Sequence, residues 1–337
     1  MKAIYDKFVW PVKNFKAKIP RIYYLNKIFY CSSFLWRKVF LSLDCKNYKL
    51  IPNWYIDDYL SDTTIKNLLF FKFFYLSDFI FNLFIKFNVF LVKKNKLQMN
   101  NDEVIILGPY INNHAHKITE FLLRLFILKE FKNIKKVYVP DELKALIHSL
   151  KINIYLGNIE INYYKSHENY FFYNAHYLSH IETRKYNSTY KKSVQVLKKI
   201  INSQKFVRNS KYKYILISRE NNKRKLLNEA ELFQALEPLG FLKINFEKLN
   251  IKEQINISRN AKVIIGYHGA GLMNCFFMSR NSTFIEIVNA HYNHPLFKLI
   301  SKLLKLNYKN FFCSENFQNL DGICKTKEIV QYIKRIL

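Results

Sequence analysis

The 337-residue sequence predicts an α/β fold with two Rossmann-like domains that face each other across a cleft. Short apolar runs alternate with helical segments from about residue 102 onward, which is typical of βαβ units with a parallel sheet. The alternation then occurs a second time, and this second half contains a glycine cluster. Half of the residues are hydrophobic, which is enough for two separate cores.

The first half is the less regular one. Residues 1–98 are aromatic and basic, and their pattern assigns no elements. After them we expect strands at Val104–Leu107, Lys136–Val139 and Ile152–Tyr155, a helix from about Asn113 to Lys129, a helix through Ile147, loops and short strands over Ile161–His180, and a polar connecting helix from about Tyr186 to Gln204.

The second half repeats the scheme with clearer boundaries. Asn228 with Glu231, and Asn250 with Glu253, have the spacing of helix N-terminal caps, and Gly240 ends a helix. The expected strands are Tyr214–Ile217, Phe241–Phe246, Val263–Ile265 and Thr283–Val288, and a final amphipathic helix runs from Thr326 to the C-terminus.

The most informative feature is the cluster Gly266-Tyr267-His268-Gly269-Ala270-Gly271, in a chain with only seven glycines. It lies between the strand Val263–Ile265 and a helical run at Leu272–Met278. A helix N-terminus behind such a turn offers N–H groups and a positive dipole end to a phosphate. Its spacing is neither the dinucleotide fingerprint nor a Walker loop, and a tight turn without a ligand is the alternative.

The composition favours anionic partners. Lys and Arg number 54 against 25 Asp and Glu, and the net charge of +29 suits nucleic acid, anionic lipid or phosphorylated small molecules. An AT-biased genome would also enrich Lys, Asn, Ile, Phe and Tyr. The N-terminus lacks the apolar core of a signal peptide. Lys72 and Asp78 interrupt the apolar segment Leu68–Lys86, so we expect a core or interfacial segment there and no transmembrane helix.

Three segments resemble glycosyltransferase family 61. The first contains Ile217-Ser218-Arg219, Arg224 and Leu227–Leu232, and the second is Ala261–Asn274, with its His-Gly-Ala-Gly motif, continuing to Phe284-Ile285-Glu286. Upstream, Asn113-His114-Ala115-His116, Glu120 and Arg124 resemble the family's N-x-x-H-x-x-x-[DE]-x-x-x-R-L segment. The resemblance covers roughly residues 104–287, and the chain departs from the family pattern at Lys117, Leu123 and 279–281.

This resemblance implies a GT-B-like enzyme that moves a sugar, with inversion, from a nucleotide diphosphate to a saccharide or lipid-linked acceptor. Several bacterial relatives synthesise surface polysaccharide, so capsule or lipopolysaccharide synthesis is the implied role. The expected co-substrate is a UDP-sugar, with no further cofactor. The expected domains are 1–205 on the acceptor side, with an aromatic-rich N-terminal extension, 206–312 for donor binding, and 313–337 as a helical tail.

The residues themselves favour a diphosphate site. Arg219 and Arg224 follow a predicted parallel strand, where α/β sheets bind ligands, and arginine forms bidentate bonds with phosphate. Gly269, Ala270 and Gly271 would add backbone N–H groups that stabilise the leaving diphosphate. A solvated basic loop is the alternative interpretation of the two arginines.

Three more side chains are candidates for donor binding. His268 is expected to contact the diphosphate or the sugar, or to be a buried imidazole bonded to a neighbouring carbonyl. Asn274 either reaches a phosphate or caps its own turn. Glu286 either accepts ribose hydroxyls or is a partly buried glutamate paired with lysine.

We expect metal-independent chemistry. No D-x-D motif occurs, whereas metal-dependent sugar-nucleotide transferases hold Mg²⁺ or Mn²⁺ with paired carboxylates. The histidine pairs at 176/180 and 291/294 lack flanking carboxylates, so no metal site is predicted.

The acceptor's proton requires a base opposite the donor. His116, Glu120 and Arg124 are spaced i, i+4, i+8, so a regular helix would place them on one stripe. We predict His116 as the base because an imidazole titrates near neutral pH. Glu120 would orient it or be the base itself, with Arg124 and Asn113 in support. A structural ion pair with a satisfied histidine is the alternative.

Two other functions compete with sugar transfer. A nucleic-acid-binding protein would explain the charge and the 17% aromatic content, but the basic residues are spread along the chain and no binding motif occurs, so we expect no nucleic acid partner. A family member that binds a sugar nucleotide without catalysis is the second alternative. We expect a cytoplasmic location, peripheral at the anionic inner face of the cell membrane.

Overall fold

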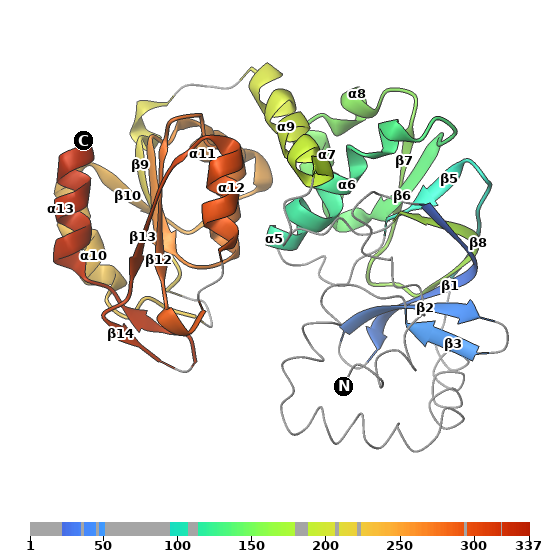
Figure 1. Cartoon of the computed structure of the whole chain (residues 1–337), viewed down its shortest axis with the longest axis horizontal. Helices are drawn as coiled ribbons and strands as arrows, with labels where there is room; N and C mark the ends of the chain where they lie inside the picture. Colours follow the sequence, from blue (N-terminus) through green and yellow to red (C-terminus); the bar gives the residue numbers. More distant parts are fainter. Residues whose placement is uncertain are drawn as a thin grey trace, which may run out of the picture. The chain divides into compact units, whose positions relative to one another are not determined.

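The computed structural model describes residues 22–34, 37–44, 47–50, 95–106, 114–178, 188–205, 209–220, 224–292, 295–317 and 319–337 (Figure 1). Contacts divide the chain into two compact units, Met1–Ser193 and Val194–Leu337, and each is described by itself. The prediction of an α/β fold is confirmed in both, with an all-parallel sheet in the second unit and parallel strands within a mixed sheet in the first.

The second unit contains a five-stranded parallel sheet. Its strand order is β10-β9-β11-β12-β13, which is the order 2-1-3-4-5 of one common doubly wound fold. The strands are β9 (Tyr214–Ile217), β10 (Phe241–Ile244), β11 (Val263–Tyr267), β12 (Thr283–Val288) and β13 (Asn307–Phe312), and a separate hairpin pairs β14 (Glu315–Asn316) with β15 (Gly322–Ile323).

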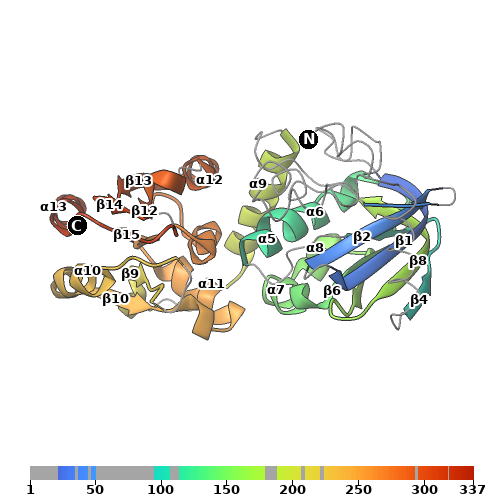
Figure 2. The ribbon, with the colours of Figure 1, turned by 90° about the horizontal axis from the view of Figure 1, so that it is seen from below.

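Helices cover both faces of this sheet (Figure 2). On one face α10 and α13 pack on apolar side chains of β9, β11 and β12, and Ile329 and Ile333 of α13 are fully buried there. Burying such a side chain contributes about 1.5–3 kcal/mol, so α13 is part of this core. The helical segments are η4 (Ser210–Tyr212), α10 (Glu229–Leu236), η5 (Glu237–Leu239), η6 (Phe246–Lys248), α11 (Ile251–Asn260), η7 (Ala270–Phe277), η8 (Ala290–Tyr292), α12 (Leu296–Leu304) and α13 (Thr326–Ile336).

Local sequence signals explain several helix ends of this unit. Asn250 and Glu253 form the predicted capping box at α11, and Gly240, with φ of 83°, ends η5 in the left-handed conformation. Helix α10 begins after Asn228 as predicted, but the Asn228 side chain accepts no hydrogen bond from the helix N–H groups. Its side chain instead bonds to the Cys324 backbone, accepting from N at 2.9 Å and donating to O at 3.0 Å. Asn228 therefore ties the start of α10 to the chain after β15.

The first unit contains a mixed sheet with the order β3-β2-β1-β8-β5-β6-β7, and β4 pairs with β8. β5, β6, β7 and β8 run parallel where they pair, whereas β1 is antiparallel to β2 and β8. The strands are β1 (Ile22–Phe34), β2 (Arg37–Asp44), β3 (Asn47–Leu50), β4 (Asn95–Gln98), β5 (Glu103–Ile105), β6 (Lys136–Pro140), β7 (Glu160–Tyr164) and β8 (Tyr170–Leu178).

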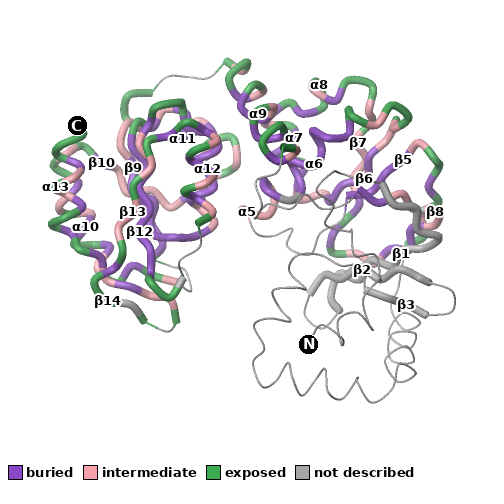
Figure 3. The backbone as a smooth tube through the Cα atoms, viewed as in Figure 1, coloured by how far each residue is buried: buried purple, intermediate pink, exposed green. Residues whose placement is uncertain are grey.

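Short helical segments lie between these strands, and their apolar residues, together with those of the strands, form the purple, buried stretches of the first unit in Figure 3. They are α5 (His114–His116), the π-helix η1 (Lys117–Leu122), α6 (Leu123–Leu125), η2 (Leu128–Glu130), η3 (Asp141–Leu143), α7 (Lys144–Ser149) and α8 (Ile152–Leu156), followed by the connecting helix α9 (Ser188–Ser203).

One prediction for this unit is wrong, and a second is right only in part. The run Ile152–Tyr155 is not a strand but part of helix α8, which buries Ile152 and Leu156 while Ile154 is 71% exposed. This i, i+4 burial suits a helix between the left-handed residues Lys151 and Gly157. The region predicted as loops and short strands contains β7 and the nine-residue strand β8.

The segment Leu68–Lys86 lies outside the described residues, and so does Asn113. Within the described ranges, no helix has both the length and the apolar character required to cross a membrane.

Candidate active site

The second unit offers a ligand site where its strand order reverses. β9 has β10 on one side and β11 on the other, and in such sheets ligands bind outside the carboxyl ends of the strands at this point. The residues that follow β9 are Ser218 and Arg219, and those that follow β11 are His268 and Gly269. The two halves of the predicted donor site therefore come from adjacent strands.

Arg219 lies directly against the glycine turn. A Cβ atom on Gly269 would overlap Nη1 of the Arg219 guanidinium, so only glycine fits while the arginine keeps this position. The backbone of Gly269 is extended, with φ of 167°, and would suit any residue. The glycine is therefore required by the close approach of Arg219 and not by its own conformation.

Buried polar contacts fix Arg219 in place. Its backbone N–H donates to Glu229 Oε2 of α10 at 2.9 Å, and its Nε donates to the Arg224 carbonyl at 3.2 Å. Burial, and then the nearby charge of Arg224, lower the pKa of Arg219, but a guanidinium remains charged at neutral pH. Arg219 and Arg224, which both follow β9, thus lie close together, and their combined positive charge favours an anionic ligand.

The segment after the glycine turn is a 3₁₀ helix, η7, where the sequence pattern indicated an ordinary helix. Ala270 and Gly271 at its start are partly exposed, and the first N–H groups of a helix lack partners within it. Asn274 is fully buried, and its Nδ2 donates to the Gly271 carbonyl at 3.0 Å and to Gln254 Oε1 at 3.1 Å. Asn274 therefore braces its own turn against α11.

The other end of η7 is held by a buried cation that the sequence analysis missed. Lys198 of α9 donates from Nζ to the carbonyl oxygens of Phe276 and Met278. Positive charge at a helix C-terminus is favourable, although burial lowers the pKa of Lys198 to about 8. The available signal was a lysine within the apolar stripe of α9, which buries Val194 and Ile201.

His268, Glu286 and Tyr308 form a buried chain of contacts behind the turn. His268 Nδ1 contacts Glu286 Oε1, and the Tyr308 hydroxyl donates to Glu286 Oε2. Burial, and then the Glu286 charge, raise the pKa of Tyr308, which keeps the phenol protonated as a donor. Phe297 of α12 packs edge-on against the imidazole, with ring centroids 5.2 Å apart. Both oxygens of Glu286 thus have protein partners. The carboxylate, held by Tyr308, fixes the orientation of the His268 imidazole.

The predicted acceptor-side residues lie in the first unit, after β5. His116 is half-buried at the end of α5, and the side chain of Glu120 lies outside what the structure describes. Arg124 is completely buried, where its Nη1 donates to the Leu178 carbonyl at 3.2 Å and its guanidinium lies 5.3 Å from the Phe121 ring centroid.

The regular helix expected to carry His116, Glu120 and Arg124 is wrong. Residues 117–122 form the π-helix η1 between two single turns of α-helix. The shared stripe of the three side chains stays a prediction, because the side chain of Glu120 lies outside what the structure describes. π-Bulges are frequent at functional sites.

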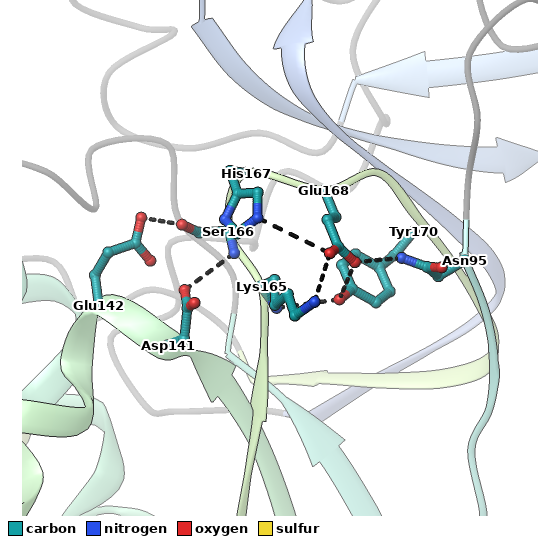
Figure 4. A network of polar contacts seen from close by, with 8 residues as sticks. All are labelled: Asn95, Asp141, Glu142, Lys165, Ser166, His167, Glu168 and Tyr170. Carbon is teal, nitrogen blue, oxygen red and sulfur yellow. Dashed lines mark hydrogen bonds and ion pairs between the residues drawn. The ribbon is translucent and has the colours of Figure 1, made fainter.

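A polar network that the sequence analysis missed joins the carboxyl ends of β6 and β7 (Figure 4). The Ser166 backbone N–H donates to Asp141 Oδ1 at 3.1 Å, and its hydroxyl donates to Glu142. Burial raises the pKa of Asp141, but hydrogen bonds with Ser166 and Glu142 and the nearby His167 together outweigh it, and the net pKa is lowered. The network positions carboxylates at the ligand-binding edge of this sheet. The sequence signal that could have revealed this network is the acidic pair Asp141-Glu142 directly after the apolar strand β6.

Comparisons with known proteins agree with this geometry. The family model described as Glycosyltransferase 61 matches residues 114–285, about half of the chain. A beta-1,2-xylosyltransferase of Oryza sativa subsp. japonica is 36% identical over 92 residues, which cover 25% of this chain and 17% of the relative. An EGF domain-specific O-linked N-acetylglucosamine transferase of Gallus gallus is 29% identical over 102 residues, which cover 29% of this chain and 19% of the relative. The matched segments thus span about a fifth, or less, of these relatives.

Proposed function

The chain belongs to glycosyltransferase family 61, and on that premise we propose that it transfers a sugar, with inversion, from a nucleotide diphosphate donor to a saccharide or lipid-linked acceptor. The observation that carries the proposal is the Arg219 guanidinium lying on Gly269 at the reversal of strand order. The donor diphosphate would lie on residues 269–271, with Arg219 and Arg224 beside it.

The chemistry follows from this placement. An acceptor oxygen attacks the anomeric carbon, the bond from that carbon to the diphosphate oxygen breaks, and the diphosphate leaves with the bonding electrons. Arg219, Arg224 and the N–H groups of the glycine turn would stabilise the charge that develops there. We assign to His268, held by Glu286, a hydrogen bond to the diphosphate or the sugar. We propose that no metal ion takes part, since the arginines supply the positive charge.

We propose His116 as the base that accepts the acceptor's proton, in a GT-B-like arrangement of the two units. His116→Ala should then lower kcat by ~10²–10⁴ while UDP affinity stays unchanged. Near-normal turnover in this variant, together with loss of turnover in Glu120→Gln, would assign the base to the carboxylate. If both variants keep their turnover, neither residue is the base.

The names of the relatives suggest which donors to test first. One relative is named for xylosyl transfer and another for N-acetylglucosaminyl transfer, so UDP-xylose and UDP-N-acetylglucosamine head the panel. We propose surface-polysaccharide synthesis as the role, in the cytoplasm at the inner face of the cell membrane. The net charge of +29 supports the last point, because cations near an anionic surface contribute ~1 kcal/mol each.

A thermal-shift panel of UDP-sugars and single-stranded oligonucleotides tests the function. We expect one UDP-sugar to raise the melting temperature and then to be hydrolysed slowly, with release of UDP. A shift without turnover, even with candidate acceptors, would indicate a binding protein without catalysis. A shift with oligonucleotides alone would overturn the proposal in favour of nucleic-acid binding.

A further inference from the structure

A cavity of about 1220 Å³ lies at the opposite edge of the second unit's sheet from the proposed donor site. It is lined at the amino ends of four parallel strands, by Tyr214, Val263, Thr283 and Asn307. The C-terminal end of α13, marked C in Figure 1, also lines it. Because the donor site lies at the carboxyl ends of the same strands, this cavity is separate from it.

Four cationic side chains line this cavity, namely Lys213, Arg259, Lys262 and Arg280, and we call it the basic cavity. No aspartate or glutamate is among its lining residues. Asparagine and serine side chains make up much of the remaining wall. The hydroxyls of Ser279 and Ser282 already donate to backbone carbonyls, whereas the side chains of Asn209 and Ser210 can donate to an anion. The cavity therefore combines positive charge with neutral donors.

Three of the four cations of the basic cavity are not neutralised by an aspartate or glutamate side chain of the described residues. In the part of the chain that the structure describes, Lys213, Lys262 and Arg280 form no ion pair with a carboxylate. The ammonium of Lys213 lies 4.7 Å from the Tyr214 ring centroid, and the buried Arg259 donates to the Ile201 carbonyl. Like charges that share a cavity repel one another, and an anion bound between them removes that repulsion.

We propose that the basic cavity binds a phosphate group, independently of the donor site. A phosphate carries up to two negative charges and several acceptor oxygens, which matches a set of lysines and arginines with neutral donors around them. The phosphate can belong to a lipid headgroup or to a soluble compound, since both present the same chemistry. The first source would hold the second unit on an anionic membrane, and the second would make the cavity a regulatory site.

The test uses the full chain and two probes. Inorganic pyrophosphate is titrated by calorimetry, and vesicles of phosphatidylcholine with and without phosphatidic acid are co-sedimented. The variant combines Lys213→Ala, Lys262→Ala and Arg280→Ala. Its matched control combines Lys132→Ala, Lys191→Ala and Lys199→Ala, which removes the same charge from exposed positions elsewhere. Melting temperatures confirm folding, and single Lys262→Ala and Arg280→Ala variants replace the triple variant if it does not fold.

We expect the cavity variant to lose about tenfold or more in affinity relative to the control, because each lost charged hydrogen bond costs roughly that factor. Loss of binding to phosphatidic acid vesicles identifies a lipid headgroup as the source. Loss of pyrophosphate binding alone identifies a soluble phosphate. Equal binding of both probes by the cavity variant and its control overturns the proposal. Arg219→Ala, tested in parallel, separates this result from pyrophosphate bound at the donor site.

Discussion

Replacing Gly269 with alanine should weaken donor binding by displacing Arg219. The added methyl group would overlap the guanidinium, whereas the extended backbone at this position suits alanine without strain. The effect therefore acts through the arginine and not through the backbone. Since a hydrogen bond to a charged group contributes about 1.5–3 kcal/mol, we expect the dissociation constant of UDP to rise by about 10- to 150-fold.

A double-mutant cycle separates this mechanism from others. UDP binding is measured by calorimetry on the wild type, Gly269→Ala, Arg219→Ala and the double variant. Once the arginine is truncated, the methyl group has free space, so Gly269→Ala should cost almost nothing in that background. Gly271→Ala shows what a methyl group costs elsewhere in the turn, because a Cβ there would meet only Ile217 Cγ2, at 3.4 Å.

The reasoning would be refuted by equal costs of Gly269→Ala in both backgrounds. That result would mean that the donor itself, and not Arg219, lies against the glycine. Thermal melting of each variant without ligand separates loss of folding from loss of binding.

Three further outcomes are expected. Tyr308→Phe should lower kcat about tenfold with little change in UDP affinity. The reason is that it removes the hydrogen bond that positions Glu286 and, through Glu286, His268. An unchanged kcat would reduce Tyr308 to a structural role. Activity should survive EDTA, and a complete loss that Mn²⁺ restores would contradict metal independence. The folded-state pKa of Lys198, about 8, lies below its ordinary 10.5, so the wild type should gain stability between pH 8 and 10.5, by at most about 3 kcal/mol. Parallel pH–stability curves for the wild type and Lys198→Met would contradict this assignment.

The second unit was largely predictable because its signals are local. The strand Thr283–Val288 was predicted with its observed bounds, since six mostly apolar residues bounded by polar ones are buried almost throughout. The capping box of α11 spans only four residues. The predicted Arg219 and Gly269 meet because parallel strands place their carboxyl ends at one edge, a rule that needs no knowledge of side-chain contacts.

The errors arise where contacts between residues distant in sequence determine the local structure. The run Ile152–Tyr155 carries strand-forming residues, but short apolar runs are ambiguous, and flanking left-handed residues made it a helix. Tyr308 could not be identified because its strand was not predicted and its partner Glu286 lies 22 residues away. The π-helix that contains Glu120 was not predicted, because the sequence there has the pattern of an ordinary α-helix.

The position of Arg219 has a consequence for the donor-free protein. Its guanidinium is buried beside a second arginine, and in the described residues it forms no ion pair with a carboxylate. Glu247 and Glu229 stabilise its charge only from a distance, and burial together with Arg224 still lowers its pKa. A buried charge without a direct ion pair costs free energy, and the bound diphosphate would offset that cost. Arg219→Met replaces the charged side chain with an apolar, unbranched one, so it should raise the melting temperature of the donor-free protein while reducing the stabilisation by UDP. A lower melting temperature for this variant would mean that Arg219 holds the fold together and that its charge is not reserved for the donor.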